Sequence, residues 1–350
     1  MKATLARILL LVACAGLVAG CEDEDEELLD AAPYGGAHVW GAAEAGAVNG
    51  RAAGARFNNP ANVEVGTDDG TVYIADFDNN LVRAISPGGI VRTLVAKPGF
   101  QRPFGLTWGF DNFLYVQTDD NDSGAHGPNT GTVWKVDPDT GAATVVARDI
   151  GRPRGLMALP DGRIALSDLS HNALSLLDPD TGAVTPLAGL ADTAGFADGT
   201  GTAARFDRPY GLALDEDGTL LVADQNNNRI RRVTLAGVVT TFAGSGVAGN
   251  ADGALLSATF RGPQDVEIVG STVFVAEPSN HVIRRIAGGS VTTFAGNGTA
   301  GFVDADGTAA AFFGLEGIAT TPFGHLLFVA DGNGGSGDPF NRVRFISTGL

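Results

Sequence analysis

Short apolar runs alternate with turn-forming residues along the chain, most regularly between residues 205 and 244. Two of these runs flank Asp217 and Gly218, and an Asp-Gly pair between apolar runs is a strong signal for a β-hairpin. An asparagine-rich turn then leads to a third run, and Gly237 leads to a fourth. The stretch therefore predicts four short antiparallel strands. They cover residues 211–214, 220–223, 229–233 and 238–242.

The same unit recurs along the chain, which predicts a repeat architecture. A proline precedes the first predicted strand of five units, an acid ends the second strand of five, and the units are about 42 to 56 residues apart. Units of this length with four strands each are typical of β-propellers, whose sheets pack radially around a channel. The prolines are Pro60, Pro103, Pro153, Pro209 and Pro263, and the acids are Asp76, Asp168, Asp224, Glu277 and Asp331.

The strand count predicts how the ring closes. Six units supply a first, second and third strand, but the sixth ends with its third strand at residues 342–346. Residues 37–41 precede a segment rich in glycine and alanine, as the fourth strand at 241–244 does in its own unit. We therefore predict an all-β, six-bladed β-propeller of four-stranded antiparallel blades over residues 37–350. Its last blade would be closed by the N-terminal strand, which hides both open sheet edges.

The repeated motifs resemble the NHL repeat. They are Arg-Phe-x-x-Pro-x-Gly-Leu at 205–212, Leu-Val-Ala-Asp at 221–224, Asn-x-Arg-Ile-Arg-Arg at 227–232 and Val-Thr-Thr-Phe-Ala-Gly at 239–244. The resemblance covers residues 37–350 and is strongest in units one, four and five. It implies the six-bladed fold but no single activity, because the family includes enzymes, RNA-binding proteins and interaction platforms.

The amino-terminal segment predicts a lipid-anchored leader. Two bases precede an apolar run at residues 8–19, which is too short to span a bilayer but suits a secretory signal. The sequence Val-Ala-Gly-Cys ending at Cys21 resembles a bacterial lipobox, which implies removal of residues 1–20 and lipidation of Cys21. The acidic residues 21–36 would then form a tether, and the ring would face the periplasm or the cell exterior of a bacterial envelope. The alternative is an ordinary secretory signal that happens to end in cysteine.

The charge of the chain limits its partners. The formal net charge is −17, and the arginines of the predicted third strands are spread around the ring rather than gathered on one face. Nucleic-acid binding needs a basic face, so this class of partner is not expected. We expect a monomeric ring, anchored to the membrane through Cys21, whose partner is a protein, peptide or glycan.

The candidate binding face is the top of the ring, where the connections from the second to the third strand and from the fourth strand to the next blade would lie. Loops on a rigid ring are a usual place for binding. By the resemblance, residues at or just before the first-strand glycine of the family line the channel mouth. These are Asn62, Phe104, Arg154, Tyr210, Gln264, Asp265 and Glu316. Aromatic, charged and amide groups at one rim would suit a small ligand or peptide, although a solvated rim without a ligand is the alternative.

A second candidate site is a calcium loop. Asp119, Asn121 and Ser123 offer oxygens at alternate positions, as calcium loops do, and calcium is the one cofactor that the sequence suggests. Thr130 stands where an EF-hand has its bidentate glutamate, so an acidic turn is the alternative. The repeated acids, such as Asp224, are expected to cap the turn of their own blade by accepting backbone N–H groups.

Two functions fit these patterns. The first is a non-enzymatic binding or interaction platform on the top face, with no catalytic residue. The second is a lactonase- or lyase-like propeller enzyme, in which Asn62, Asp265 and Glu316 would hold a divalent metal and Arg154 would position an anion. The sequence has neither the His/Cys spacing of a zinc site nor a nucleophile elbow, which favours the platform.

Overall fold

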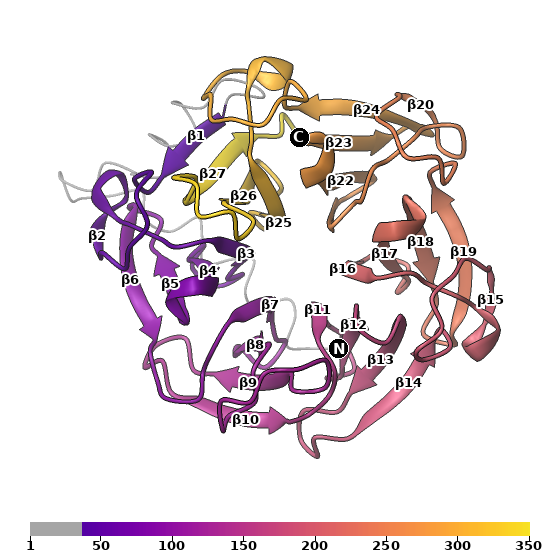
Figure 1. Cartoon of the computed structure of the whole chain (residues 1–350), viewed down its shortest axis with the longest axis horizontal. Helices are drawn as coiled ribbons and strands as arrows, with labels where there is room; N and C mark the ends of the chain where they lie inside the picture. The colour runs from indigo at the N-terminus through magenta and orange to yellow at the C-terminus, as the bar shows by residue number, and fades with distance from the viewer. Residues whose placement is uncertain (1–36) are drawn as a thin grey trace, which may run out of the picture.

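A computed structural model describes residues 37–350, which form six β-sheets around a central channel (Figure 1). Each sheet is a blade whose first strand lines the channel and whose last strands lie at the outer edge. The prediction of an all-β, six-bladed propeller is confirmed. The predicted signal segment, the tether and Cys21 lie outside the described residues. Within residues 37–350, none of the helices has the length and apolar character needed to cross a bilayer.

Within each blade the strands follow the chain outward from the channel as an antiparallel meander. In blade one these are β3 (Pro60–Val65), β4 (Val72–Asp76), β5 (Leu81–Ile85) and β6 (Ile90–Val95); in blade two β7 (Pro103–Trp108), β8 (Leu114–Thr118), β9 (Thr132–Val136) and β10 (Ala143–Ala147); and in blade three β11 (Pro153–Ala158), β12 (Ile164–Asp168), β13 (Ala173–Leu177) and β14 (Val184–Ala188).

The second half of the ring repeats this arrangement. Blade four contains β16 (Pro209–Leu214), β17 (Leu220–Asp224), β18 (Arg229–Val233) and β19 (Val238–Ala243); blade five contains β21 (Asp265–Val269), β22 (Thr272–Glu277), β23 (Val282–Ala287) and β24 (Ser290–Ala295); and blade six contains β25 (Gly314–Thr320), β26 (Leu326–Gly332), β27 (Arg342–Ser347) and β1 (Ala37–Trp40).

The N-terminal strand β1 closes the ring, as predicted. It pairs antiparallel with β27, so that Ala37 lies opposite Ile346 and Trp40 lies opposite Val343. The buried ring of Trp40 stacks on Phe328 with the centroids 5.4 Å apart, which fixes the strand on the last blade. Blade six therefore combines the two ends of the described chain.

Three blades have a fifth strand, which corrects the prediction of four strands per blade. A two-residue strand from the long loop before each of these blades pairs with the outermost strand of that blade. Blades two and three keep four strands because the loops before them are short. The extra strands are β2 (Gly50–Arg51) on β6, β15 (Gly199–Thr200) on β19 and β20 (Gly253–Ala254) on β24.

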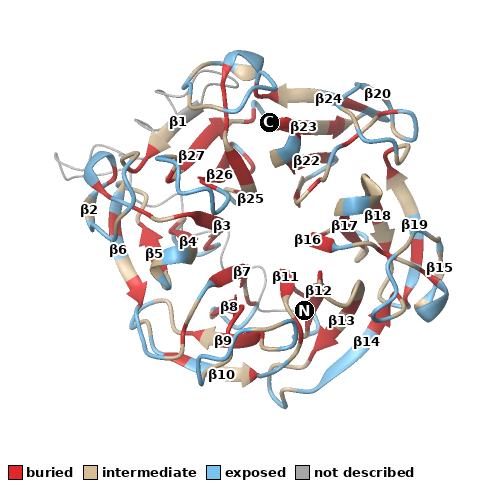
Figure 2. Ribbon diagram, viewed as in Figure 1, coloured by how far each residue is buried: buried red, intermediate tan, exposed pale blue. Residues whose placement is uncertain are grey.

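The core lies between neighbouring sheets, where most strand residues are buried (Figure 2). A phenylalanine that stands two to five residues before the first strand is fully buried in five blades. A fully buried phenylalanine contributes about 1.5–3 kcal/mol, so its recurrence in the motif reflects packing. These residues are Phe57, Phe100, Phe206, Phe260 and Phe312.

A buried arginine in the third strand ties the long loop to its blade. In blade four, Arg231 is fully buried, and it donates to the carboxylates of Asp224 (2.7 Å) and Asp198 (2.6 Å). Asp224 ends β17, whereas Asp198 belongs to the long loop, so one guanidinium joins the two. The equivalent arginines of blades one, five and six are Arg83, Arg284 and Arg344.

The acids that end the second strands do not mainly cap their own turns, which corrects the prediction. Asp224 accepts the backbone N–H of Asp207 at 2.9 Å, and Asp76 accepts that of Asn58 at 2.7 Å. Both donors lie in the loop before the first strand rather than in the turn after the acid. Asp168 does cap its own turn, since it accepts the N–H of Ser170 at 2.9 Å.

Candidate functional site

The first strands place one side chain each at the upper end of the channel. In most blades the pairing of the first two strands shifts register at this place, as between Pro103 and Leu106 and between Pro209 and Leu212. Such bulges re-aim side chains. The ring of Phe104 meets that of Tyr210 edge-on, with the centroids 5.6 Å apart. The residues at this level, which we call the mouth, are Ala61, Phe104, Arg154, Tyr210, Gln264 and Glu316.

Arg154 is the central cation of the mouth. Its side chain is 8% exposed, and its Nη2 donates to the carboxylate of Asp119 at 2.9 Å. Its guanidinium lies over the ring of Phe104, 3.9 Å from the centroid. Its Nε and Nη1 have no hydrogen-bond partner. The buried third-strand arginines, such as Arg231, bond through both terminal nitrogens, so Arg154 is unlike them.

Asp119 forms ion pairs with two arginines. It also accepts from Arg152 Nη2 at 2.5 Å. Burial alone would raise the pKa of Asp119, but the guanidinium groups of Arg154 and Arg152 bring this pKa below its ordinary value. The carboxylate therefore stays ionised at neutral pH. Two cations share this one anion.

The residues of the predicted calcium loop bond to protein groups in the structure, which leaves the calcium site a prediction. The Oδ1 atom of Asn121 accepts the N–H of Ser123 at 3.1 Å and its hydroxyl at 2.7 Å, so it stabilises a local turn. Asp119 points instead to Arg152 and Arg154. Over residues 37–350, no group of three or more His, Cys, Asp or Glu side chains is placed to hold a metal ion.

Glu316 lies across the channel from Arg154, because blades six and three are opposite in a ring of six (Figure 1). In the described part of the chain, no ion pair joins the two residues, and the Glu316 carboxylate has no hydrogen-bond partner. Burial raises the pKa of Glu316 to about 7, although the charge of Arg154 opposes this shift. Glu316 can therefore change its charge near neutral pH.

Two more polar groups at the mouth lack partners among the described residues. The hydroxyl of Tyr210 makes no hydrogen bond, and burial raises its pKa. The Oε1 atom of Gln264 is buried and unpaired. Together with Arg154 and Glu316, these residues present two donors and two acceptors around one opening.

The predicted rim residues Asn62 and Asp265 lie one level below the mouth, in the channel wall. Both carboxylate oxygens of Asp265 accept backbone N–H groups, from Val266 at 3.0 Å and Ile318 at 2.8 Å. Burial raises the pKa of Asp265 to about 8. The cavity that Asn62 and Asp265 line has a volume of about 30 Å³. That is room for water rather than for a metabolite.

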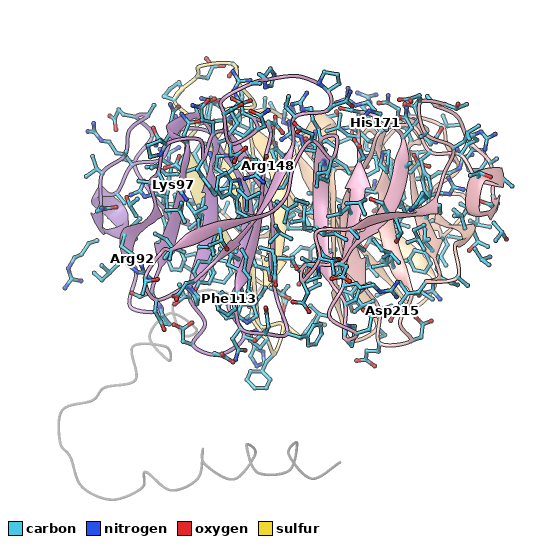
Figure 3. The ribbon with its side chains drawn as sticks, turned by 90° about the horizontal axis from the view of Figure 1, so that it is seen from below. Arg92, Lys97, Phe113, Arg148, His171 and Asp215 are labelled. Carbon is cyan, nitrogen blue, oxygen red and sulfur yellow. The ribbon has the colours of Figure 1, made fainter. Side chains whose placement is uncertain are left out.

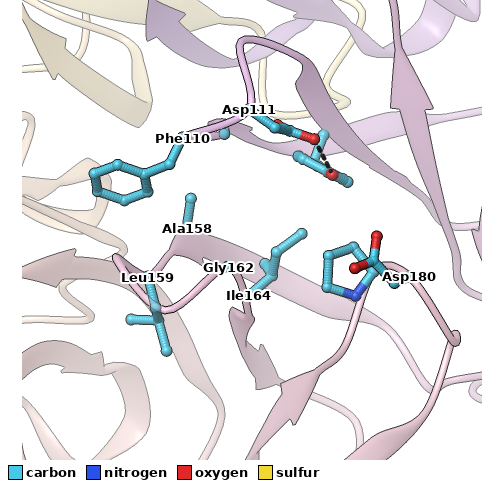
Figure 4. A pocket seen from close by; sticks show the side chains of 10 residues that line it. Phe110, Asp111, Ala158, Leu159, Gly162, Ile164 and Asp180 are labelled. Atoms are coloured by element: carbon cyan, nitrogen blue, oxygen red, sulfur yellow. Dashed lines mark hydrogen bonds between the residues drawn. The ribbon is translucent and has the colours of Figure 1, made fainter. Parts of the chain in front are cut away.

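Two further hollows lie away from the channel. Figure 3 shows the disc from the side, with His171 at the top face and Phe113 and Asp215 at the bottom. A cavity of about 130 Å³ lies between the hairpin turns of blades two and three, where Phe110 and Ile164 line it (Figure 4). A shallower hollow of about 410 Å³ lies at the outer edge of blade five.

Comparison with known sequences finds the NHL repeat. The family model of this repeat matches residues 206–233. The chain is 31% identical over 179 residues to the chloroplastic protein suppressor of quenching 1 of Arabidopsis thaliana, which covers 51% of this chain and 14% of that protein. It is 26% identical over 302 residues to NHL repeat-containing protein 2 of Gallus gallus, covering 71% of this chain and 41% of that protein. The chain thus spans less than half the length of these relatives.

Comparison with solved structures finds other propellers. An auxiliary nutrient binding protein from Bacteroides ovatus superposes with a TM-score of 0.71 at 17% identity, over 90% of this chain and 77% of that one. A gluconolactonase from Xanthomonas campestris superposes with a TM-score of 0.57 at 14% identity, over 83% of this chain and 86% of that one. At such identities the likeness shows the fold alone.

Proposed function

Since this chain is an NHL-repeat β-propeller, we propose that it is a non-enzymatic binding module that holds a small solute or the end of a peptide at the channel mouth. The observation that carries the proposal is the set of unpaired polar groups there, on Arg154, Tyr210, Gln264 and Glu316. Those of Arg154 (Nε and Nη1) and Gln264 (Oε1) are buried, and a buried polar group without a partner costs about 1–3 kcal/mol. A ligand that pairs them recovers this free energy.

The shape of the channel supports binding at the mouth rather than deeper. The cavity below it, beside Asp265, has room only for water. The rings of Phe104 and Tyr210 form an apolar side of the opening, with their centroids 5.6 Å apart. An opening with an apolar wall and a few convergent polar groups is typical of small-molecule sites.

The comparisons agree with a binding role without naming a ligand. The fold is shared with an auxiliary nutrient binding protein (TM-score 0.71) and with a gluconolactonase (TM-score 0.57). We prefer binding because the predicted metal ligands lie at two levels of the channel. Glu316 is at the mouth, whereas Asp265 lies below it, and both of its carboxylate oxygens accept backbone N–H groups. An enzyme would need those oxygens for its metal.

We propose in addition that the module is held at a bacterial envelope through lipidated Cys21. The support is the sequence of the leader alone, in which an apolar run precedes Val-Ala-Gly-Cys. One lipidated cysteine with two or three acyl chains gives stable anchoring.

The binding proposal can be tested with a panel of sugars, amino acids, dicarboxylates and short peptides, in thermal-shift measurements followed by isothermal titration calorimetry. We expect Arg154→Met and Tyr210→Phe each to weaken a panel ligand about tenfold, the equivalent of ~1.4 kcal/mol. Arg163→Met is the matched control, because Arg163 pairs with Asp161 in a bottom-face turn. Either the absence of any panel ligand or equal affinity in wild type and mouth variants would contradict the proposal.

A further inference from the structure

Positive charge gathers on one side of the mouth. Arg102, Arg152 and Arg208 occupy the same place in blades two, three and four, immediately before the proline of the first strand. Among the described ion pairs, Asp119 is the carboxylate that pairs with Arg152 and Arg154, and neither Arg102 nor Arg208 has an acidic partner. Four guanidinium groups, those of Arg102, Arg152, Arg154 and Arg208, therefore lie on this side of the mouth.

Arg102 and Arg208 bond to a histidine and a glutamine rather than directly to acids. Arg102 Nη1 lies 3.3 Å from a ring nitrogen of His126, and Arg208 Nε donates to the side-chain carbonyl of Gln225 at 3.0 Å. The other ring nitrogen of His126 lies 2.5 Å from Asp120 Oδ1, so this carboxylate offsets part of the charge near Arg102. Arg154, whose Nη1 has no hydrogen-bond partner, is therefore the cation of this side that is left to bind an anionic group.

The opposite side of the mouth offers acceptors. Glu316 in blade six faces Arg154 across the channel, and the buried Oε1 atom of Gln264 in blade five is unpaired. No ion pair bridges Arg154 and Glu316 within residues 37–350. Among these residues, Glu316 has no cationic partner, and Nη1 of Arg154 is unpaired although its Nη2 bonds to Asp119.

We infer that the mouth binds a zwitterion, namely an amino acid or a short peptide with free ends. The ligand carboxylate lies toward Arg154 and the hydroxyl of Tyr210, both of which can donate hydrogen bonds. The ligand ammonium lies toward Glu316 and Gln264, because an ammonium donates three hydrogen bonds and accepts none. This inference rests on the proposed binding function of the mouth and narrows its ligand.

Both charges of the ligand are needed. A ligand with a carboxylate alone would leave Glu316 unpaired, and one with an ammonium alone would leave Nη1 of Arg154 unpaired. The side chain of the ligand lies against Phe104 and Tyr210, since the cavity below the mouth admits only water. Phe104 covers the guanidinium of Arg154 at 3.9 Å, so a ligand that reaches Nη1 turns this ring aside.

Binding of the ammonium depends on the ionisation of Glu316. Arg154, Asp78 and Asp119 act on this carboxyl, and burial raises its pKa to about 7. The nearby hydroxyl of Tyr210 stays protonated, because burial raises its pKa. Raising the pH from 6 to 7 ionises more of Glu316, while a peptide ammonium, whose ordinary pKa is about 7.7–8.0, stays mostly charged, so zwitterion binding should strengthen. Glu316→Gln should remove this pH dependence.

The test is isothermal titration calorimetry at pH 7, where a peptide ammonium is mostly protonated, with glycyl-leucine, its N-acetyl derivative and its C-terminal amide. We expect the dipeptide to bind and each blocked form to bind at least about tenfold more weakly. Glu316→Gln should weaken the dipeptide but not the N-acetyl form, whereas Arg154→Met should weaken the dipeptide but not the amide. Arg163→Met should match wild type.

The outcomes separate this inference from the binding function on which it rests. If a blocked form binds as tightly as glycyl-leucine, the zwitterion inference is wrong. It is also wrong if leucine and glycyl-leucine do not bind while a sugar or dicarboxylate does. In both cases the binding function stands if Arg154→Met or Tyr210→Phe weakens that ligand. If no solute binds at the mouth, both fail.

Discussion

Substitution of Arg231 would measure how strongly the buried ion clusters stabilise this ring. The fully buried guanidinium of Arg231 makes four hydrogen bonds. The acceptors are Asp224 Oδ2 (2.7 Å), Asp198 Oδ1 (2.6 Å), the carbonyl of Arg205 (3.0 Å) and that of Ala197 (2.9 Å). Arg231→Met keeps most of the side-chain length but removes all four. Because it leaves Asp224 buried without its cation, we expect the free energy of unfolding to fall by about 3–5 kcal/mol.

A bond count gives a similar magnitude, since four hydrogen bonds at about 1 kcal/mol each amount to about 4 kcal/mol. The neighbouring Arg232 is the control. Its side chain is 35% exposed, and its partners Asp215 and Asp217 lie at 3.1 Å and 3.6 Å. Exposed ion pairs contribute about 0–1 kcal/mol, so Arg232→Met should cost no more than that. Urea denaturation at pH 8, followed by tryptophan fluorescence and far-UV circular dichroism, measures both.

The pH dependence of the loss is a second check. Burial raises the pKa of Asp224 to about 6 even beside Arg231. A pKa raised in the folded state gives stability at low pH that is lost as the pH rises through this value. Without Arg231 the carboxyl should hold its proton more tightly, so the variant should be less destabilised at pH 5 than at pH 8. Equal losses for Arg231→Met and Arg232→Met, or equal losses at both pH values, would refute the reasoning.

Three other outcomes can be measured. Burial raises the pKa of Asp265 to about 8, so the free energy of unfolding of the wild type should fall between pH 5 and pH 9. In Asp265→Asn this fall, measured by the midpoints of urea denaturation, should be smaller. Gly211→Ala should cost about 1–3 kcal/mol in thermal denaturation, because the added Cβ would lie 2.7 Å from the Cα of Asp265, whereas Gly54→Ala has nothing within 4 Å and should be neutral. Cys21→Ser should abolish palmitate incorporation and move the protein to the soluble fraction; continued membrane association would argue against the lipid anchor.

The fold could be predicted because the sequence pattern that specifies one blade is repeated along the chain. Each unit contains the same turns and the same apolar runs, so a weak signal in one unit is supported by the others. The closure by β1 followed from counting strands, although β1 and β27 are about 300 residues apart in sequence. A single unit would not have shown this pairing.

The buried arginines were harder to recognise, because their environment depends on a loop from another part of the sequence. From the sequence, third-strand arginines such as Arg231 were interpreted as charge spread around the ring. A usable signal was present, since the acid and the arginine are seven residues apart in blades one, four and five. The loop carboxylate of Asp198 completes the set. In blade six this place belongs to Asp304.

The mouth was predicted in part. Phe104, Arg154 and Tyr210 do meet there, as equivalent positions in a ring must. Asn62 and Asp265 follow those positions by one residue, and the level of each side chain depends on strand bulges that no sequence period reveals. Asp119 is 35 residues from its partner Arg154, in the neighbouring blade, so no local pattern indicated this pair.

Closure by β1 also sets the order in which the ring can be completed. The first described strand to be synthesised has its partner in β27, so it must wait until Arg342–Ser347 has been made. Blades one to five can pair their strands as each is finished, but blade six joins residues from both ends of the ring. Joining such distant segments is slow, because a long loop must close before the contact forms. Until then β1 offers an unpaired edge, which makes the late, open ring the state most exposed to mispairing.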